Sequence, residues 1–146
     1  MSKDLHESGL EIWPPVRDDA LCRPECVTLP VGVFNPPEVN ALPIRFRVAF
    51  LCVAGLRVFS VETRTNYCNG TIPERRTMLE MKASQAEDGR VCYASKAWFS
   101  VAPREFERFY VRFCRNLPFE AGEIVAFTVR VATEGGTSER NLRFRL

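Results

Sequence analysis

The sequence has little to support acid–base or metal chemistry, because its 146 residues include a single histidine, His6. Many proton-transfer mechanisms and metal sites in proteins use histidine side chains. A sequence with one histidine is therefore a poor candidate for either function. Net charge is small as well, with 20 Lys+Arg against 18 Asp+Glu and a formal balance of +2. We therefore expect no strong overall field that would attract nucleic acid or anionic lipid.

Long apolar segments and nucleotide-binding patterns are also missing. No run approaches the roughly 18 apolar residues that indicate a membrane-spanning helix, and residues 1–7 begin no secretory signal. We therefore expect a cytoplasmic protein that does not enter a membrane. The patterns G-x-x-x-x-G-K-[ST], G-x-G-x-x-G, G-x-S-x-G and H-E-x-x-H do not occur. The sequence thus predicts no cofactor and no enzymatic activity.

Six cysteines are present, at positions 22, 26, 52, 68, 92 and 114. Without a secretory signal we expect all six to be reduced, because disulfides are rare in the cytosol. The alternative is a framework of three disulfides, which six cysteines can form in 15 pairings. Cys22 and Cys26 have a spacing that can chelate zinc, but a second closely spaced pair of ligands is lacking. We therefore predict no metal site.

The chain changes composition near residue 43. Residues 1–43 contain seven of the ten prolines and carry a net charge of −4, whereas residues 44–146 carry +6. Dense proline excludes a long helix and favours extended backbone. Trp13 and other apolar side chains of this region are too hydrophobic for a free tail. We predict that 1–43 is a proline-rich arm packed on a domain formed by 44–146.

Alternation of apolar and polar residues dominates the second region, which is typical of half-buried strands. Clear examples are Phe46, Val48 and Phe50 in 44–52, and Phe127, Val129 and Val131 in 123–132. Further strands are expected at 27–34, 56–64, 91–101 and 138–146. About eight short strands separated by turn residues predict an all-β protein. The expected architecture is a single antiparallel β-sandwich, either immunoglobulin-like or jelly-roll-like.

Two segments fit more than one structure. Residues 77–88 begin like a capped helix at Thr77, but Asp88-Gly89 is also a hairpin signal that would join strands 77–84 and 91–101. We favour the hairpin. Residues 103–113 have aromatic side chains at helical spacing after Pro103, and they also alternate from Arg108 onward. One helical turn followed by a strand fits both patterns.

The C-terminal part also has a recognisable order of turns and strands. Leu117-Pro118-Phe119, Gly122-Glu123, the strand 125–131 and Gly135-Gly136 follow one another. This stretch resembles the last hairpin of immunoglobulin-like and fibronectin-like sandwiches. The resemblance covers less than a quarter of the chain and implies an architecture, not a function.

Arginine is the one strongly biased residue type, since 17 of the 20 basic residues are arginine. Guanidinium groups bind carboxylates through a planar fork and stack on aromatic rings. If the strands near 108–112 and 143–145 were neighbours, their outward side chains would form one stripe on the surface. We predict that this stripe binds a partner through Arg108, Tyr110, Arg112, Arg143 and Arg145. Glutamates lie between these arginines, so the region lacks the charge density that nucleic acid requires.

These observations predict a non-enzymatic interaction domain that binds an acidic protein through a sheet edge or an arginine-rich face. A carbohydrate- or small-molecule-binding sandwich is the alternative, with Trp13 or Trp98 as an aromatic platform. Binding of single-stranded nucleic acid is a further alternative, because such sites combine cations with aromatic rings.

Overall fold

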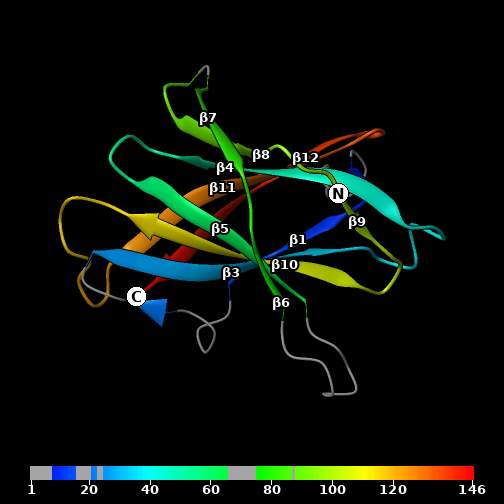
Figure 1. Cartoon of the computed structure of the whole chain (residues 1–146), viewed down its shortest axis with the longest axis horizontal. Coiled ribbons are helices and arrows are strands. Elements are labelled where there is room, and N and C mark those ends of the chain that lie inside the picture. The colour runs from blue at the N-terminus through cyan, green and yellow to red at the C-terminus, as the bar shows by residue number, and fades with distance from the viewer. Residues whose placement is uncertain (1–7, 16–20, 23–24, 66–74, 87) are drawn as a thin grey trace.

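Two antiparallel sheets packed face to face form the protein (Figure 1). The computed structural model describes residues 8–15, 21–22, 25–65, 75–86 and 88–146. All regular elements of this part are strands, so the predicted all-β sandwich is confirmed. The described residues form twelve strands rather than the expected eight or so, and several of the twelve are short.

The first sheet has the order β1-β3-β10-β5-β6, and β2 pairs with β3. Its central pair, β3 and β10, runs in register over nine residues from Phe106 opposite Phe34 to Cys114 opposite Cys26. The bounds of its strands are β1 Glu11–Trp13, β2 Leu21–Cys22, β3 Cys26–Phe34, β5 Arg57–Thr65, β6 Arg75–Met78 and β10 Phe106–Cys114. Because β3 is central, part of the region that we expected to be an arm is integral to this sheet.

The second sheet has the order β12-β11-β4-β8-β7, and β9 pairs with the start of β4. The predicted Gly135-Gly136 hairpin is present, since β11 and β12 pair from Thr133 opposite Gly136 to Ile124 opposite Arg145. Its strands are β4 Ile44–Cys52, β7 Met81–Gln85, β8 Val91–Ser95, β9 Phe99–Val101, β11 Ile124–Thr133 and β12 Gly136–Arg145. The expected strand 91–101 is therefore divided in two by residues 96–98.

The hydrophobic core lies between the sheets and follows the alternation seen in the sequence. Every second residue of the long strands points inward, and the largest fully buried side chains are Phe46, Phe50, Phe109 and Phe113. The rings of Phe99 and Phe109 meet edge to face with centroids 5.1 Å apart, an arrangement that aromatic pairs favour. Burying one such side chain contributes roughly 1.5–3 kcal/mol.

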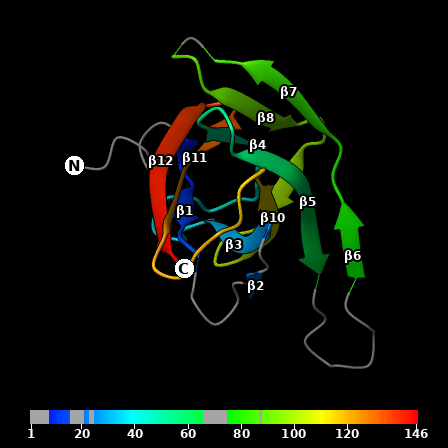
Figure 2. The ribbon, with the colours of Figure 1, turned by 90° about the vertical axis from the view of Figure 1, so that its left-hand side faces the viewer.

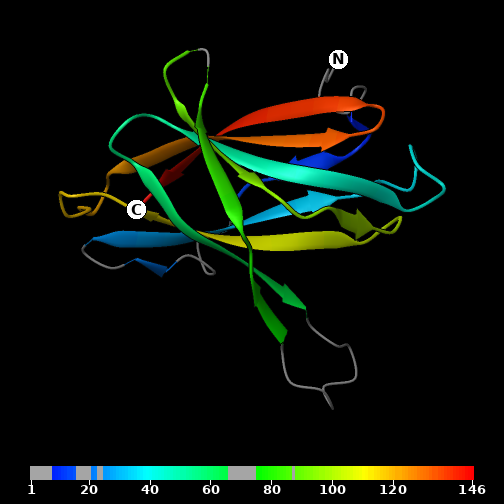
Figure 3. The ribbon, with the colours of Figure 1, turned by 45° about the horizontal axis from the view of Figure 1, so that its top comes forward.

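The edges of the two sheets are joined on both sides of the sandwich. Residues 75–85 run from β6, at the edge of the first sheet, to β7, at the edge of the second (Figure 3). On the other side β1 of the first sheet lies beside β12 of the second (Figure 2). Here the guanidinium of Arg140 donates to the carbonyl of Ile12 at 2.6 Å, and the Ser8 amide donates to the Ser138 hydroxyl.

The structure settles both ambiguous segments. The predicted hairpin is present between β7 and β8, and Gly89 has a φ of 86°, which favours glycine in the turn. The expected strand 77–84 is divided, because Thr77 and Met78 belong to β6 of the first sheet. In 103–113 the expected helical turn is absent. Residues 102–105 form a tight turn closed by the Glu105 amide on the Ala102 carbonyl, and β10 starts at Phe106.

The expectation of six reduced cysteines is wrong for one pair. Cys26 and Cys114 form a disulfide between directly opposed residues of β3 and β10, with their Cα atoms 4.3 Å apart. A sequence separation of 88 hides this contact from any local pattern. Cys52 and Cys92 are free and buried, as expected. The side chain of Cys22 and all of Cys68 lie outside the described residues. Cys26, the other member of the Cys22–Cys26 spacing, is held in the disulfide.

Candidate functional site

Aromatic side chains gather on the outer face of the first sheet, where β1, β3 and β10 lie side by side. Trp13 stacks on Phe34 with ring centroids 4.6 Å apart and an interplanar angle of 25°. Its ring centroid lies 5.5 Å from that of Phe106. Trp13 is 39% exposed and Phe106 is 42% exposed, so this cluster forms part of the surface instead of the core.

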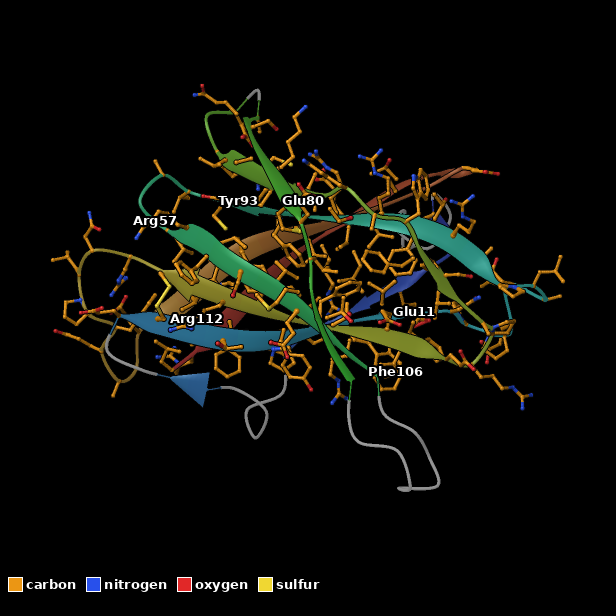
Figure 4. All side chains as sticks on the ribbon, viewed as in Figure 1. Glu11, Arg57, Glu80, Tyr93, Phe106 and Arg112 are labelled. Carbon is orange, nitrogen blue, oxygen red and sulfur yellow. A yellow bond between two sulfur atoms is a disulfide. The ribbon has the colours of Figure 1, made fainter. Side chains whose placement is uncertain are left out.

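Arginines continue this surface along β10. Alternation places Arg108, Tyr110 and Arg112 on the outer side, opposite the buried Phe109 and Val111. The Arg108 guanidinium carbon is 5.1 Å from the Phe106 ring centroid, and that of Arg112 is 5.3 Å from the ring of Phe59 on β5. These distances are within the range of cation–π attraction. Phe106 and Arg112 lie at opposite ends of β10 (Figure 4).

We call this surface the aromatic–arginine face and define it by Trp13, Phe34, Phe59, Phe106, Arg108, Tyr110 and Arg112. Gly32 lies beneath it, opposite Trp13 on β1 and Arg108 on β10. A Cβ atom at Gly32 would lie 3.4 Å from the Cβ of Trp13 and 3.8 Å from Phe106. Both distances are ordinary van der Waals contacts, so the aromatic side chains lie directly over this position. The Cys26–Cys114 disulfide lies on the same side of the sheet, two residues beyond Arg112.

Only part of the predicted stripe is brought together. Arg108, Tyr110 and Arg112 share one face, but Arg143 and Arg145 lie on β12 of the second sheet. There they point away from the core, because Phe144 between them packs against the core and Leu142 before them is buried. The two groups lie on opposite outer faces of the sandwich because β10 and β12 are not neighbours. The expected stripe does not form.

The aromatic members of the face were largely missed by sequence reasoning. Trp13 was expected to be buried, and it is partly exposed. Phe59 also lies outward, because the pairing of β10 with β5 shifts register between Arg112 and Phe113. The alternation of β10 was the only available signal. The pairing of β1 with β3 and of β3 with β10 depends on contacts between distant parts of the chain.

A small buried cluster lies on the outer face of the second sheet. Leu51 is only 1% exposed there, in a small cluster with Ala49 and Cys92. The Arg90 guanidinium donates to the Thr128 hydroxyl at 2.7 Å, and this hydroxyl donates to the Asn141 side chain at 2.6 Å. Thr128 and Cys92 are the cross-strand neighbours of Leu51. A cavity of about 500 Å³ beside them is lined by Ser84, Gln85, Ala86, Asp88, Arg90, Cys92 and Arg130.

Trp98 belongs to a second contact between an aromatic ring and arginines. It lies between β8 and β9, and the guanidinium carbons of Arg45 and Arg47 are 5.3 and 5.5 Å from its ring centroid. The two platforms that the sequence suggested, Trp13 and Trp98, therefore lie on different sheets. Arg45 also lines a cavity of about 610 Å³, together with Ser8, Gly9, Val39, Asn40, Pro43, Ile44, Thr133, Glu134 and Gly135.

Few described groups have perturbed acid–base properties. Burial raises the pKa of the Cys52 thiol to about 12, so it is protonated and unreactive at neutral pH. Burial, and then the neighbouring Glu105, raise the pKa of Glu107. Among the described residues no group of acidic, histidine or cysteine side chains has a metal-binding arrangement. None of the described segments is a helix long and apolar enough to span a membrane.

The sequence matches no protein-family model and no curated protein. Solved structures with a similar fold include the CBM3a-L domain from scaffoldin CipA of Clostridium thermocellum. It is 11% identical with a TM-score of 0.50, over 90% of this chain and 89% of that one. AvmM, which catalyses macrocyclization in alchivemycin A biosynthesis, is 9% identical with a TM-score of 0.49, over 94% and 87%.

The C-terminal domain of the Streptococcus agalactiae AgI/II polypeptide BspA is 13% identical with a TM-score of 0.43. This chain is covered to 94% and spans 49% of that one. At such identities the likeness concerns the fold alone. The two antiparallel sheets of this chain define it as a β-sandwich domain.

Proposed function

We propose that this protein is a non-enzymatic binding domain that recognises an acidic protein partner through the aromatic–arginine face. The observation that carries the proposal is the exposure of Trp13, Phe59 and Phe106 on one sheet face, beside two arginines that stack on aromatic rings. Tryptophan, tyrosine and arginine dominate the binding energy of protein interfaces. Exposed clusters of large apolar side chains on a soluble domain often mark such interfaces.

The arginines favour a partner that carries carboxylates. A guanidinium group binds a carboxylate with two parallel hydrogen bonds. Because the rings limit the motion of Arg108 and Arg112, less side-chain entropy is lost when a partner binds. Glu11 and Glu62 lie on the same sheet face, so the positive charge is local and does not match a continuous phosphate backbone.

The test uses peptides selected from a displayed random library against the wild-type protein. We expect the selected peptides to be rich in Asp and Glu and to contain apolar residues. Their affinity should fall at least about tenfold for the Arg108→Ala/Arg112→Ala variant, the usual loss when interface arginines are truncated. The matched control is Arg143→Ala/Arg145→Ala, which removes the same charge from the other sheet and should bind normally.

Two outcomes would contradict the proposal. Equal loss of affinity in both double variants would show that only overall charge matters. Full affinity after Trp13→Ala and Phe106→Ala would show that the aromatic cluster takes no part. Single-stranded DNA measured on the same variants tests the nucleic-acid alternative, which requires tight binding with a steep dependence on salt.

A further inference from the structure

Arg45 and Arg47 contact one aromatic ring and, unlike three other arginines of the described residues, have no acidic partner there. Arg90, Arg115 and Arg130 each form an ion pair with a carboxylate. No described carboxylate pairs with Arg45 or Arg47, and both stack on the ring of Trp98. Alternation along β4 places the two side chains on the same outer side of the sheet. Their Cα atoms are therefore roughly 6.8 Å apart, the spacing of alternate residues in a strand.

The loop that carries Trp98 is held in place by hydrogen bonds. The Ser95 hydroxyl accepts from the Val48 amide at 3.2 Å and donates to the Ala97 carbonyl at 3.1 Å. The Lys96 amide donates to the Glu80 carbonyl at 3.1 Å. Beyond the loop, Ser100 pairs with Arg45 in the ladder between β9 and β4. The backbone on both sides of Trp98 is therefore held close to β4, and its indole contacts Arg45 and Arg47 of that strand.

Two guanidinium groups on one ring repel each other, and the ring quadrupole offsets only part of this repulsion. Space remains beside them for a counter-charge. The cross-strand neighbour of Arg47 on β11 is Ala132, and the next residue across the sheet is Thr137. Arg45 lines the cavity of about 610 Å³ on the other side, where Glu134 lies without forming an ion pair with it.

We propose that Arg45, Arg47 and Trp98 form a binding site for a phosphate group carried by a small ligand. A phosphate monoester has a charge between −1.5 and −2 at neutral pH and three acceptor oxygens. It can therefore accept hydrogen bonds from two guanidinium forks and neutralise both of them. A carboxylate has two oxygens and one charge, so it satisfies a single fork. The site lies on the second sheet and is independent of the aromatic–arginine face.

The experiment follows Trp98 fluorescence in a Trp13→Phe background, where it is the only tryptophan. Inorganic phosphate is titrated at constant ionic strength, with acetate as the singly charged comparison. We expect a saturable signal with phosphate and at least tenfold weaker binding of acetate. The Arg45→Gln/Arg47→Gln variant should weaken phosphate binding at least tenfold. The matched control, Arg57→Gln/Arg143→Gln, removes the same charge from exposed positions and should not.

A thermal-shift series provides a second measurement that does not depend on the fluorophore. Phosphate should raise the melting temperature of the wild type, because a ligand stabilises the state that binds it. Trp98→Leu keeps both charges but removes the ring, and we expect it to reduce this increase. The proposal would be overturned if phosphate raised the melting temperature of Arg45→Gln/Arg47→Gln as much as that of the control, Arg57→Gln/Arg143→Gln. An effect of phosphate no greater than that of chloride at the same ionic strength would overturn it as well.

Discussion

The Cys26–Cys114 disulfide gives the sharpest test of the fold, because it joins distant segments at the centre of the first sheet. A crosslink over 88 residues lowers the entropy of the unfolded chain and contributes up to about 4.6 kcal/mol in the chain-entropy treatment. Domains of this kind are stable by about 5–15 kcal/mol in total. The Cys26→Ala/Cys114→Ala variant should therefore lose a large share of its free energy of unfolding.

Urea unfolding of four samples measures this contribution: the wild type and the double variant, each with and without reductant. We expect reductant to lower the midpoint of the wild type to that of the double variant and to leave the double variant unchanged. Because the nine residue pairs between β3 and β10 remain, the variant should keep its β-sheet circular dichroism. A wild-type midpoint that does not respond to reductant would refute the reasoning.

The same bond bears on the expected cytoplasmic location. Thiol titration of denatured protein without reductant should find at most four of the six cysteines reactive. Protein alkylated directly in cell extract reports the state of the pair in its own compartment. Recovery of six free thiols from the extract would fit a reducing cytosol. Four or fewer would count against that location.

Three further predictions concern stability. Asn35 is fully buried and donates to the carbonyl of Val101 at 2.9 Å, so Asn35→Ala should cost about 1–3 kcal/mol in chemical unfolding, and a smaller loss would show that the site relaxes. The raised pKa of Glu107 means that its contribution to stability is fully present below the ordinary value of 4.5 and is lost as pH rises through the folded-state value. Glu107→Gln should therefore raise the melting temperature at neutral pH and not at acidic pH, and an equal gain at both would contradict this. Deleting residues 1–43 removes β3 from the middle of its sheet, and an unchanged melting temperature of that truncation would be incompatible with the fold.

The strands that could be predicted from the sequence are those with one buried face. In β4, β11 and β12 the period of two is a local property, and the predicted inward side chains of 123–132 are all buried. Turn residues were informative for the same reason, since Gly89 and the hairpin near Gly135 depend only on local backbone conformation. What local pattern could not give is the partner of each strand. Residues 44–52 predicted a strand correctly, but not that it would pair with β8, β9 and β11.

The sequence also did not predict that some residues on the outer face of the second sheet are buried. Leu51 occupies an outward position of β4 and is still buried, in a cluster with Ala49 and Cys92. An outward apolar residue in the sequence suggests either an exposed surface or a strand covered on both faces. The neighbours that distinguish the two here, Cys92 on β8 and Thr128 on β11, are distant in the sequence.

The arginine bias of the sequence gains a more specific meaning from the structure. Arginines that pair with nearby carboxylates, such as Arg130 with Glu139, add little stability at an exposed surface, and lysine would serve there. Arginines that stack on rings, such as Arg47 and Arg112, use the planar guanidinium, which lysine does not have. The sequence shows only how many arginines there are. The contacts show which of them use the planar group, and these include residues of both proposed sites, on opposite sheets.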